Sequence, residues 1–110
     1  MKRTNLGEFE ELVLLTIAAF NTEAYGVLIK EEIEARTKRR VSMGAMYTSL
    51  GRLEKKKFIS STWGDAIPER GGKRKRLFSI TSLGKNALME TKQIRDGLYA
   101  MSLNLISAKK

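Results

Sequence analysis

Apolar residues recur at helical spacing at the start of the chain. They fall at intervals of three and four, at Leu6, Phe9, Val13, Ile17 and Phe20, and this spacing predicts a helix. Other faces of the same segment are apolar too, so the helix needs cover on more than one side. We expect one side to face its own domain and another to face a partner subunit.

A shorter stripe predicts the second helix. Tyr25, Ile29 and Ile33 stand four residues apart, which indicates an amphipathic helix. Residues 36–40 follow as a polar basic loop. Val41 is a single apolar residue after this loop, and we expect it to form one short edge strand.

The third helix is predicted from Met43 to Lys57. Ser42, directly before it, is a favourable N-cap. Gly44 and Gly51 each cost about 1 kcal/mol relative to alanine in a helix interior. We expect them to be used because another surface approaches this helix closely. The core stripe of the helix is Met46, Leu50 and Leu53.

A basic hairpin follows the third helix. Two short β-leaning segments, residues 58–63 and 77–81, flank Arg70-Gly71-Gly72-Lys73-Arg74-Lys75-Arg76. The glycine pair allows the positive φ values of a hairpin tip, and the cations suit a phosphate backbone. On the first strand we expect Trp63 to be a partly buried ring that covers the sheet, with a ligand role as the alternative.

A long helix from Ser82 to about Ser107 ends the pattern. Its seven-residue rows are Ala87, Ile94, Met101 and Ala108, and Thr91, Leu98 and Leu105. This narrow seam favours pairing with an equivalent helix. Thr91 and Gly97 weaken the seam, so we expect the first helix to share in the pairing.

Composition narrows the function classes. The chain has 110 residues and a formal net charge of +9, which suits one domain and an acidic partner such as nucleic acid. It has no cysteine and no histidine, so an enzyme is the least expected class and we expect no metal and no cofactor. The longest apolar run, residues 12–20, is shorter than the ~20 residues that span a bilayer. We expect a cytoplasmic protein without a signal peptide or a membrane partner.

The order of the elements points to DNA. Three helices followed by a basic hairpin indicate a winged helix-turn-helix, a mainly α fold with a small β-hairpin. We expect residues 1–81 to form the DNA-binding domain and residues 82–110 to form a long dimerisation helix. The N-terminal part of the third helix would then lie in the major groove.

A combined motif runs from the third helix into the last. It reads Ser42-x-Gly44-x-x-Tyr47-x-x-Leu50-x-Arg52-Leu53-Glu54, Ile59, Trp63-Gly64, Gly71-Gly72-Lys73-Arg74-Lys75 and Phe78-x-Ile80-Thr81-x-x-Gly84. With Leu14-Leu15 and Tyr25-Gly26-x-x-Ile29 upstream, it resembles the PadR-like transcriptional regulators over about residues 9–88. The single helix after the wing is similar to the family's smaller branch. The resemblance implies a homodimer made through the first and last helices and a palindromic operator, usually bound by a repressor.

Two sets of candidate residues follow. We expect the Tyr47 hydroxyl to donate to a phosphate, and Arg52 either to reach a phosphate or to pair with a glutamate. The candidate DNA-binding residues are Ser42, Gly44, Ala45, Tyr47, Thr48, Ser49, Arg52, Arg70, Gly71, Gly72, Lys73, Arg74 and Lys75. The candidate dimer-interface residues are Leu12, Leu15, Phe20, Ala87, Thr91, Ile94, Leu98, Met101 and Leu105. A small-molecule effector in the dimer interface and no effector at all are both open.

Two other function classes remain. A basic RNA-binding or ribosome-associated protein is one alternative, but sequence-specific RNA binders stack bases on exposed aromatic rings, and this chain has few aromatics. A winged-helix protein–protein adaptor is the other, and it would be monomeric and indifferent to DNA.

Overall fold

The computed structural model describes residues 6–66 and 74–107, without the side chains of Thr22, Asp65, Ala66 and residues 104–107. The elements in chain order are α1 (Glu8–Phe20), the 3-10 turn η1 (Asn21–Glu23), α2 (Gly26–Thr37), α3 (Met43–Lys55), β1 (Ile59–Ala66), β2 (Arg74–Ile80) and α4 (Ser82–Ser107). The predicted fold class, mainly helical with one antiparallel hairpin, is confirmed.

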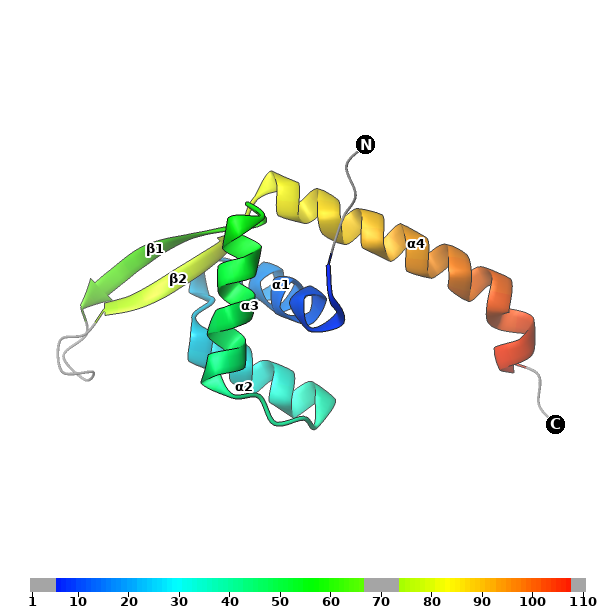
Figure 1. Ribbon diagram of the computed structural model, residues 1–110, viewed down its shortest axis with the longest axis horizontal. Helices are drawn as coiled ribbons and strands as arrows, with labels where there is room; N and C mark the ends of the chain where they lie inside the picture. The colour runs from blue at the N-terminus through cyan, green and yellow to red at the C-terminus, as the bar shows by residue number, and fades with distance from the viewer. Residues whose placement is uncertain (1–5, 67–73, 108–110) are drawn as a thin grey trace.

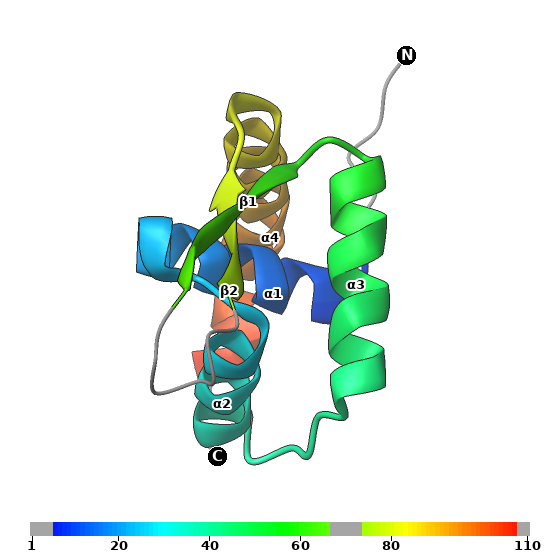
Figure 2. The same cartoon turned by 90° about the vertical axis from the view of Figure 1, so that its left-hand side faces the viewer.

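The hairpin and α4 extend from opposite sides of a helical body. In Figure 1 the hairpin points to the left of this body and α4 to the right. Figure 2 shows α3 lying along one edge of the body, beside α1 and α2. The 26 residues of α4 make a helix about 39 Å long. Beyond its first turns, an ion pair from Arg95 to Glu11 at 2.7 Å ties α4 to α1.

One hydrophobic core connects the helices with the hairpin. The central residues of the predicted stripes are buried, and Phe78 of β2 packs among them. The other stripe residues, Leu6, Phe9, Phe20 and Tyr25, are half-buried. Such burial removes apolar surface from water and is the main favourable contribution to folding. The core residues from the four elements include Val13, Ile17, Ile29, Ile33, Met46, Leu50, Leu53 and Phe78.

A backbone bridge joins the hairpin to the helical body. Ala24, between η1 and α2, bridges Phe78, whose N–H donates to the Ala24 carbonyl at 2.8 Å. The prediction of an edge strand at Val41 is therefore wrong, because Ala24 occupies that position beside β2. Val41 is buried in the core.

The carboxylate of Glu34 holds the segment that leads into α3. It accepts the backbone N–H of Val41 at 2.8 Å and the ammonium of Lys30 at 3.1 Å. The Val41 hydrogen bond, followed by the one from Lys30, lowers the pKa of Glu34 below its ordinary value. The carboxylate is therefore charged at neutral pH, and these contacts weaken only in acid.

The register of the hairpin divides its residues between two faces. The strands pair from Ile59↔Ile80 to Trp63↔Arg76, and a bulge follows before Ala66↔Arg74. Paired residues share a face, so Trp63 and Arg76 lie on the face of Phe78. Phe78 is buried, whereas Trp63 is 60% exposed. The prediction of a partly buried Trp63 ring is wrong, because this residue lies beyond the part of the face that the body covers.

The start of α4 is packed tightly against the segment after α3. Thr81 caps the helix as predicted, since its Oγ1 accepts the N–H of Gly84 at 3.0 Å and donates to the Lys57 carbonyl at 2.7 Å. A Cβ at Gly84 would collide with the carbonyl oxygen of Phe58 and lie 2.8 Å from Ile80 Cγ1. Only glycine fits at this position.

Substituting this glycine tests the close approach. Gly84→Ala is expected to lower the free energy of unfolding by roughly 1–3 kcal/mol, because the added methyl group overpacks the contact. Thermal unfolding followed by circular dichroism measures the change. Gly97→Ala in the same helix is the control, since a Cβ there meets nothing within 4 Å, and it should raise stability by up to about 1 kcal/mol. Equal stability of the two variants would contradict the packing described here.

Candidate nucleic-acid interface

The third helix has one buried face and one open face. Met46, Leu50 and Leu53 lie in the core, while Ala45 and Thr48 are exposed on the other side. Ser42 caps the helix as predicted, its Oγ accepting the N–H of Ala45 at 3.0 Å. The open face carries short side chains near the N-terminus of α3, so a ligand can approach the backbone closely.

Two glycines on α3 are not required by the packing of the chain. A Cβ at Gly44 would have Ser42 Oγ as its nearest neighbour, at 3.9 Å, and a Cβ at Gly51 would meet nothing within 4 Å. Gly44, Thr48 and Gly51 share one stripe because they are four and three residues apart. The close approach of another surface remains the prediction that accounts for both glycines. Gly51 was missing from the candidate residues and belongs with them.

Tyr47 lies at the edge of the open face. Its ring is half-exposed, and its hydroxyl would be only 3.1 Å from a Cβ at Gly26. Gly26 is the buried first residue of α2, so the Tyr47 hydroxyl lies beside the N-terminus of that helix. The partial positive charge there favours an anion, which suits the predicted contact with a phosphate.

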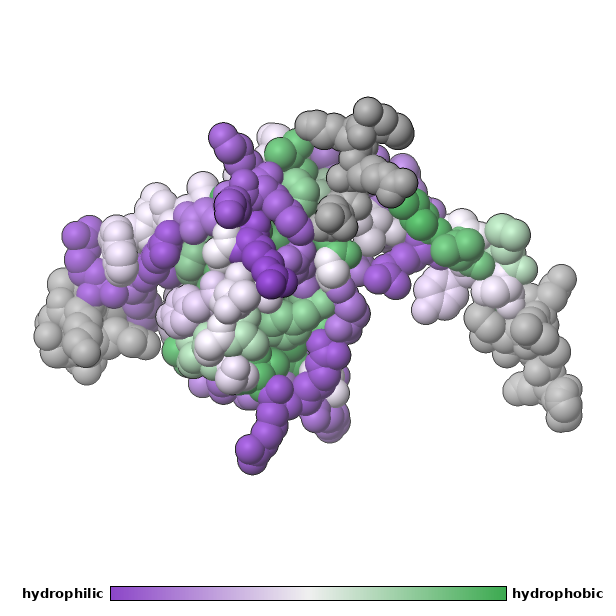
Figure 3. Space-filling model, in the orientation of Figure 1, coloured by the Kyte–Doolittle hydropathy of each residue, from purple (hydrophilic) through white to green (hydrophobic). Residues whose placement is uncertain are grey.

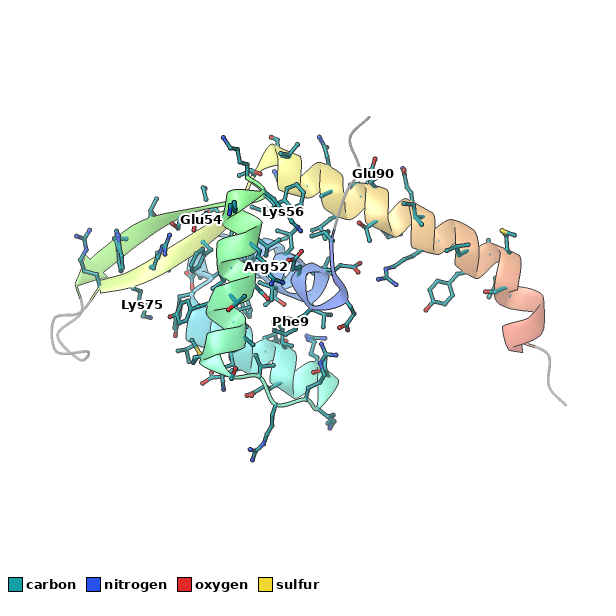
Figure 4. The ribbon with its side chains drawn as sticks, viewed as in Figure 1. Phe9, Arg52, Glu54, Lys56, Lys75 and Glu90 are labelled. Carbon is teal, nitrogen blue, oxygen red and sulfur yellow. The ribbon has the colours of Figure 1, made fainter. Side chains whose placement is uncertain are left out.

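Two other candidates on α3 differ from each other. Ser49 is 8% exposed and lies on the core side of the helix, so we remove it from the candidate surface. Arg52 is exposed, and within the described part of the chain it forms no ion pair. Figure 4 labels it beside α3, lower along the helix than Glu54. Its guanidinium is therefore available, and the alternative of pairing with a glutamate is not observed.

The cations of the hairpin are held in three different ways. Arg74 is exposed, and its Nε donates to the Gly64 carbonyl at 2.8 Å. Lys75 is half-buried with its ammonium 4.1 Å from the centroid of the Tyr25 ring. Arg76 pairs with Glu54. Of the described hairpin cations, Arg74 is thus the one that projects without an ion pair or a ring contact. The candidates Arg70, Gly71, Gly72 and Lys73 lie outside the described residues.

A polar network joins the base of the hairpin to the last turn of α3. Two contacts, at 2.9 and 3.1 Å, connect Arg76 Nη2 to the Glu54 carboxylate. Ser61 Oγ accepts from Arg76 Nε at 3.0 Å and donates to Glu54 at 2.9 Å. An exposed pair of this kind adds little stability, but the network restrains the direction in which the hairpin leaves the end of α3, where Figure 4 labels Glu54.

Sequence reasoning missed two cations before α3. In the basic segment, Arg36 pairs with Glu32 and Arg39 pairs with Glu8. Lys38 and Arg40 are exposed, and neither forms an ion pair with the described residues. Figure 3 shows strongly hydrophilic side chains at this end of the molecule. The density of charge in residues 36–40 was the signal that could have identified them.

Comparison with known proteins identifies the family. The profile of the transcriptional regulator PadR-like family matches residues 13–90, from α1 into α4. The chain belongs to this family. PadR-like proteins regulate transcription, and membership supports a winged-helix fold and DNA-binding regulation here. A comparison with curated proteins found no match.

Solved PadR-like structures have the same fold. A PadR-like transcriptional regulator from Bacillus cereus is 26% identical, with a TM-score of 0.74 over 92% of this chain and 93% of that chain. A PadR-like transcription factor from Bacteroides fragilis is 20% identical, with a TM-score of 0.74 over 88% of each chain. A PadR family regulator from Clostridium difficile is 22% identical, with a TM-score of 0.72 over 89% of this chain and 98% of that chain.

The predicted dimer residues on α1 lie beside a groove. Leu12 and Phe20 are half-buried against the core, and Leu15 is exposed. All three line an apolar groove of about 330 Å³ between α1 and α2. The rest of the chain therefore leaves part of α1 exposed.

The predicted dimer residues on α4 change from buried to exposed along the helix. Ala87 is 3% exposed and belongs to the core of its own chain, so its prediction as an interface residue is wrong. Thr91 is half-buried, and its hydroxyl donates to the Ala87 carbonyl. Ile94, Leu98 and Met101 are exposed, Met101 by 82%, and Figure 3 shows hydrophobic side chains along this part of α4. Leu105 lies in α4, but its side chain is outside the described part.

Among the described residues, the helices include none that is apolar over a length sufficient to cross a membrane. The same residues contain no group of three or more acidic, cysteine or histidine side chains placed to hold a metal ion.

The two glycines of the open α3 face generate a prediction. Gly44→Ala should leave thermal stability unchanged or higher, because the chain has room for the methyl group, yet it should weaken DNA binding about tenfold by blocking the close approach. Gly7→Ala, where a Cβ also meets nothing within 4 Å, is the control outside α3. Fluorescence anisotropy with a labelled duplex measures both. Wild-type affinity in the Gly44 variant would show that no surface approaches this position.

Proposed function

We propose that this PadR-like protein is a cytoplasmic homodimeric repressor that binds an inverted-repeat operator through α3 and the hairpin wing. The observation that carries the proposal is the open, small-residue face of α3, bordered by cations that form no ion pair in the described part of the chain. Arg52 lies on α3 itself, Arg40 precedes it, and Arg74 extends from the wing. Double-stranded DNA, an acidic polymer with grooves that admit a helix, fits such a surface.

The proposed contacts are of two kinds. Contacts to phosphates position the protein on the duplex, and contacts to base edges read its sequence. Arg52, Arg74 and the Tyr47 hydroxyl would contact phosphates, which set the register without reading sequence. Ala45 and the methyl group of Thr48, near the start of α3, would meet base edges in the major groove, where a thymine methyl offers a matching apolar contact. Gly44 and Gly51 would let the backbone of α3 lie close to the bases.

The dimer is proposed from the apolar surface that the chain leaves open. Ile94, Leu98 and Met101 form an exposed row on α4, and such a row on a projecting helix favours pairing with an equivalent helix. The groove between α1 and α2, beside Leu15, offers further apolar surface on the same chain. Two copies related by a two-fold axis would bury both and present two α3 helices to one duplex.

The wing cations are tested through salt dependence. Each phosphate contact contributes about one unit to the slope of log affinity against log salt concentration. The double variant Lys73→Ala, Arg74→Ala should therefore bind every duplex more weakly and with a slope reduced by about two. The duplex is first obtained by selection from a random pool, where an inverted repeat is expected. Recovery of structured RNA in preference to duplex DNA, or an unchanged slope, would contradict the proposed interface.

The dimer is tested by placing a charge in the exposed row. Leu98→Glu should raise the dimer dissociation constant about a hundredfold or more, because the carboxylate would be buried without a partner. Analytical ultracentrifugation measures the change. Gln93→Glu, on the same helix outside both rows, introduces the same charge as a control and should remain dimeric. A wild-type protein that stays monomeric at high concentration would overturn the proposal.

A further inference from the structure

The most exposed aromatic side chain near the candidate interface is Trp63. It is the one tryptophan in the chain, and 60% of it is open to solvent. An indole ring is a large apolar surface that folding would ordinarily cover. The body of the protein does not cover it, so its position on the wing requires another explanation.

The register places Trp63 on the face of the wing that looks toward α3. It pairs with Arg76, and antiparallel partners project to the same side. The Arg76 guanidinium reaches Glu54 in the last turn of α3 at 2.9 Å. Trp63 therefore lies on the α3 side of the hairpin, one pair farther from the body than the Thr62↔Leu77 pair.

The bulge that follows Trp63 separates it from the regular part of the hairpin. The pairing shifts between Trp63 and Ala66, and bulges bend a strand and change the direction of its side chains. The opposite face of the wing is occupied at the same level. There Lys75 lies over the Tyr25 ring, and the Leu77 side chain lies against Gly64. At the level of Trp63, the wing is thus open on the side that carries this ring.

The surroundings of Trp63 favour a polyanion over a protein partner. Arg76, its partner across the hairpin, and Arg74, beyond the bulge, are exposed and cationic, whereas the core of a protein interface is apolar. The exposed apolar row of α4 extends from the other side of the body (Figure 1), so Trp63 is remote from the proposed dimer contact. One aromatic ring among cations matches a sugar–phosphate backbone, which offers an apolar sugar and an acceptor oxygen.

We propose that Trp63 contacts the DNA backbone in the angle between the wing and α3. Its ring packs on a deoxyribose, and its indole N–H donates to a phosphate oxygen. The inference rests on the proposed DNA-binding function and adds an uncharged anchor to it. Because the indole carries no charge, this contact contributes affinity without releasing a counterion, and it positions the wing without reading bases.

The fluorescence of Trp63 tests the proposed contact directly. The full-length protein is titrated with the duplex recovered from the random pool, and tryptophan emission is followed selectively. We expect the emission of Trp63 to change on binding and its quenching by acrylamide to fall. Emission and quenching that are the same with and without saturating DNA would overturn the proposal.

Variants separate this contact from the charged ones. Trp63→Ala should raise the dissociation constant about tenfold with an unchanged salt slope, whereas the wing cations change the slope. Trp63→Phe retains the ring and loses the N–H, so its affinity should lie between the two. Thr62→Ala, exposed on the opposite face of the same strand, is the matched control and should bind like wild type. Thermal unfolding confirms that each variant is folded.

The outcomes distinguish the two proposals. If wild-type protein binds no duplex even at low salt, the proposed function fails and the Trp63 contact fails with it. If wild type binds with the expected salt slope while Trp63→Ala binds equally well, the wing contact of Trp63 is wrong and the proposed function stands. Should Trp63→Ala fail to fold, the wild-type emission and Trp63→Phe still decide the question.

Discussion

The pairing of Ala24 with Phe78 is the constraint on which the arrangement of the interface depends. One hydrogen bond joins the start of α2 to the middle of β2, and the Phe78 ring is buried among the helices. The hairpin is therefore part of the same core as α3, and the wing and the open face of α3 keep a fixed relation. The Glu54–Ser61–Arg76 network adds a second connection, from the hairpin to the last turn of α3. A two-stranded hairpin alone would be marginally stable in water.

Some cations of this protein are neutralised by ion pairs within the chain, and others are not. Carboxylates on the body pair with several of the cations, such as Glu10 with Lys56 and Glu11 with Arg95. The cations left without such partners in the described part of the chain include Arg52 on α3 and Arg40 before it. Net charge alone indicated an acidic partner, whereas the pattern of pairing shows which individual cations are left unneutralised in the described part of the chain. This pattern is a property of the fold and is not visible in composition.

Periodicity predicted the parts of the fold that are periodic. The stripes of the helices, the cap at Ser42 and the extent of α4 follow from residue spacing, and the structure agrees with them. The strand position at Ala24 was missed because a single residue has no period. The burial of Trp63 was predicted incorrectly. The alternation of side chains along a strand assigns each residue to a face, but it does not show how far the helical body covers that face. Ala87 fits a heptad row, yet tertiary packing places it in the core of its own chain.

The direction of α4 is set by contacts that lie away from the proposed DNA interface. The absence of a side chain at Gly84 lets the first turn of α4 lie against the Phe58 carbonyl. Arg95 holds the helix to Glu11 about two turns beyond the core residue Ala87. In a dimer joined through α4, this direction determines the separation and relative rotation of the two reading helices. The operators that fit the protein are then selected partly by residues that touch no nucleotide. Spacing preference and base preference can therefore change independently as the sequence diverges.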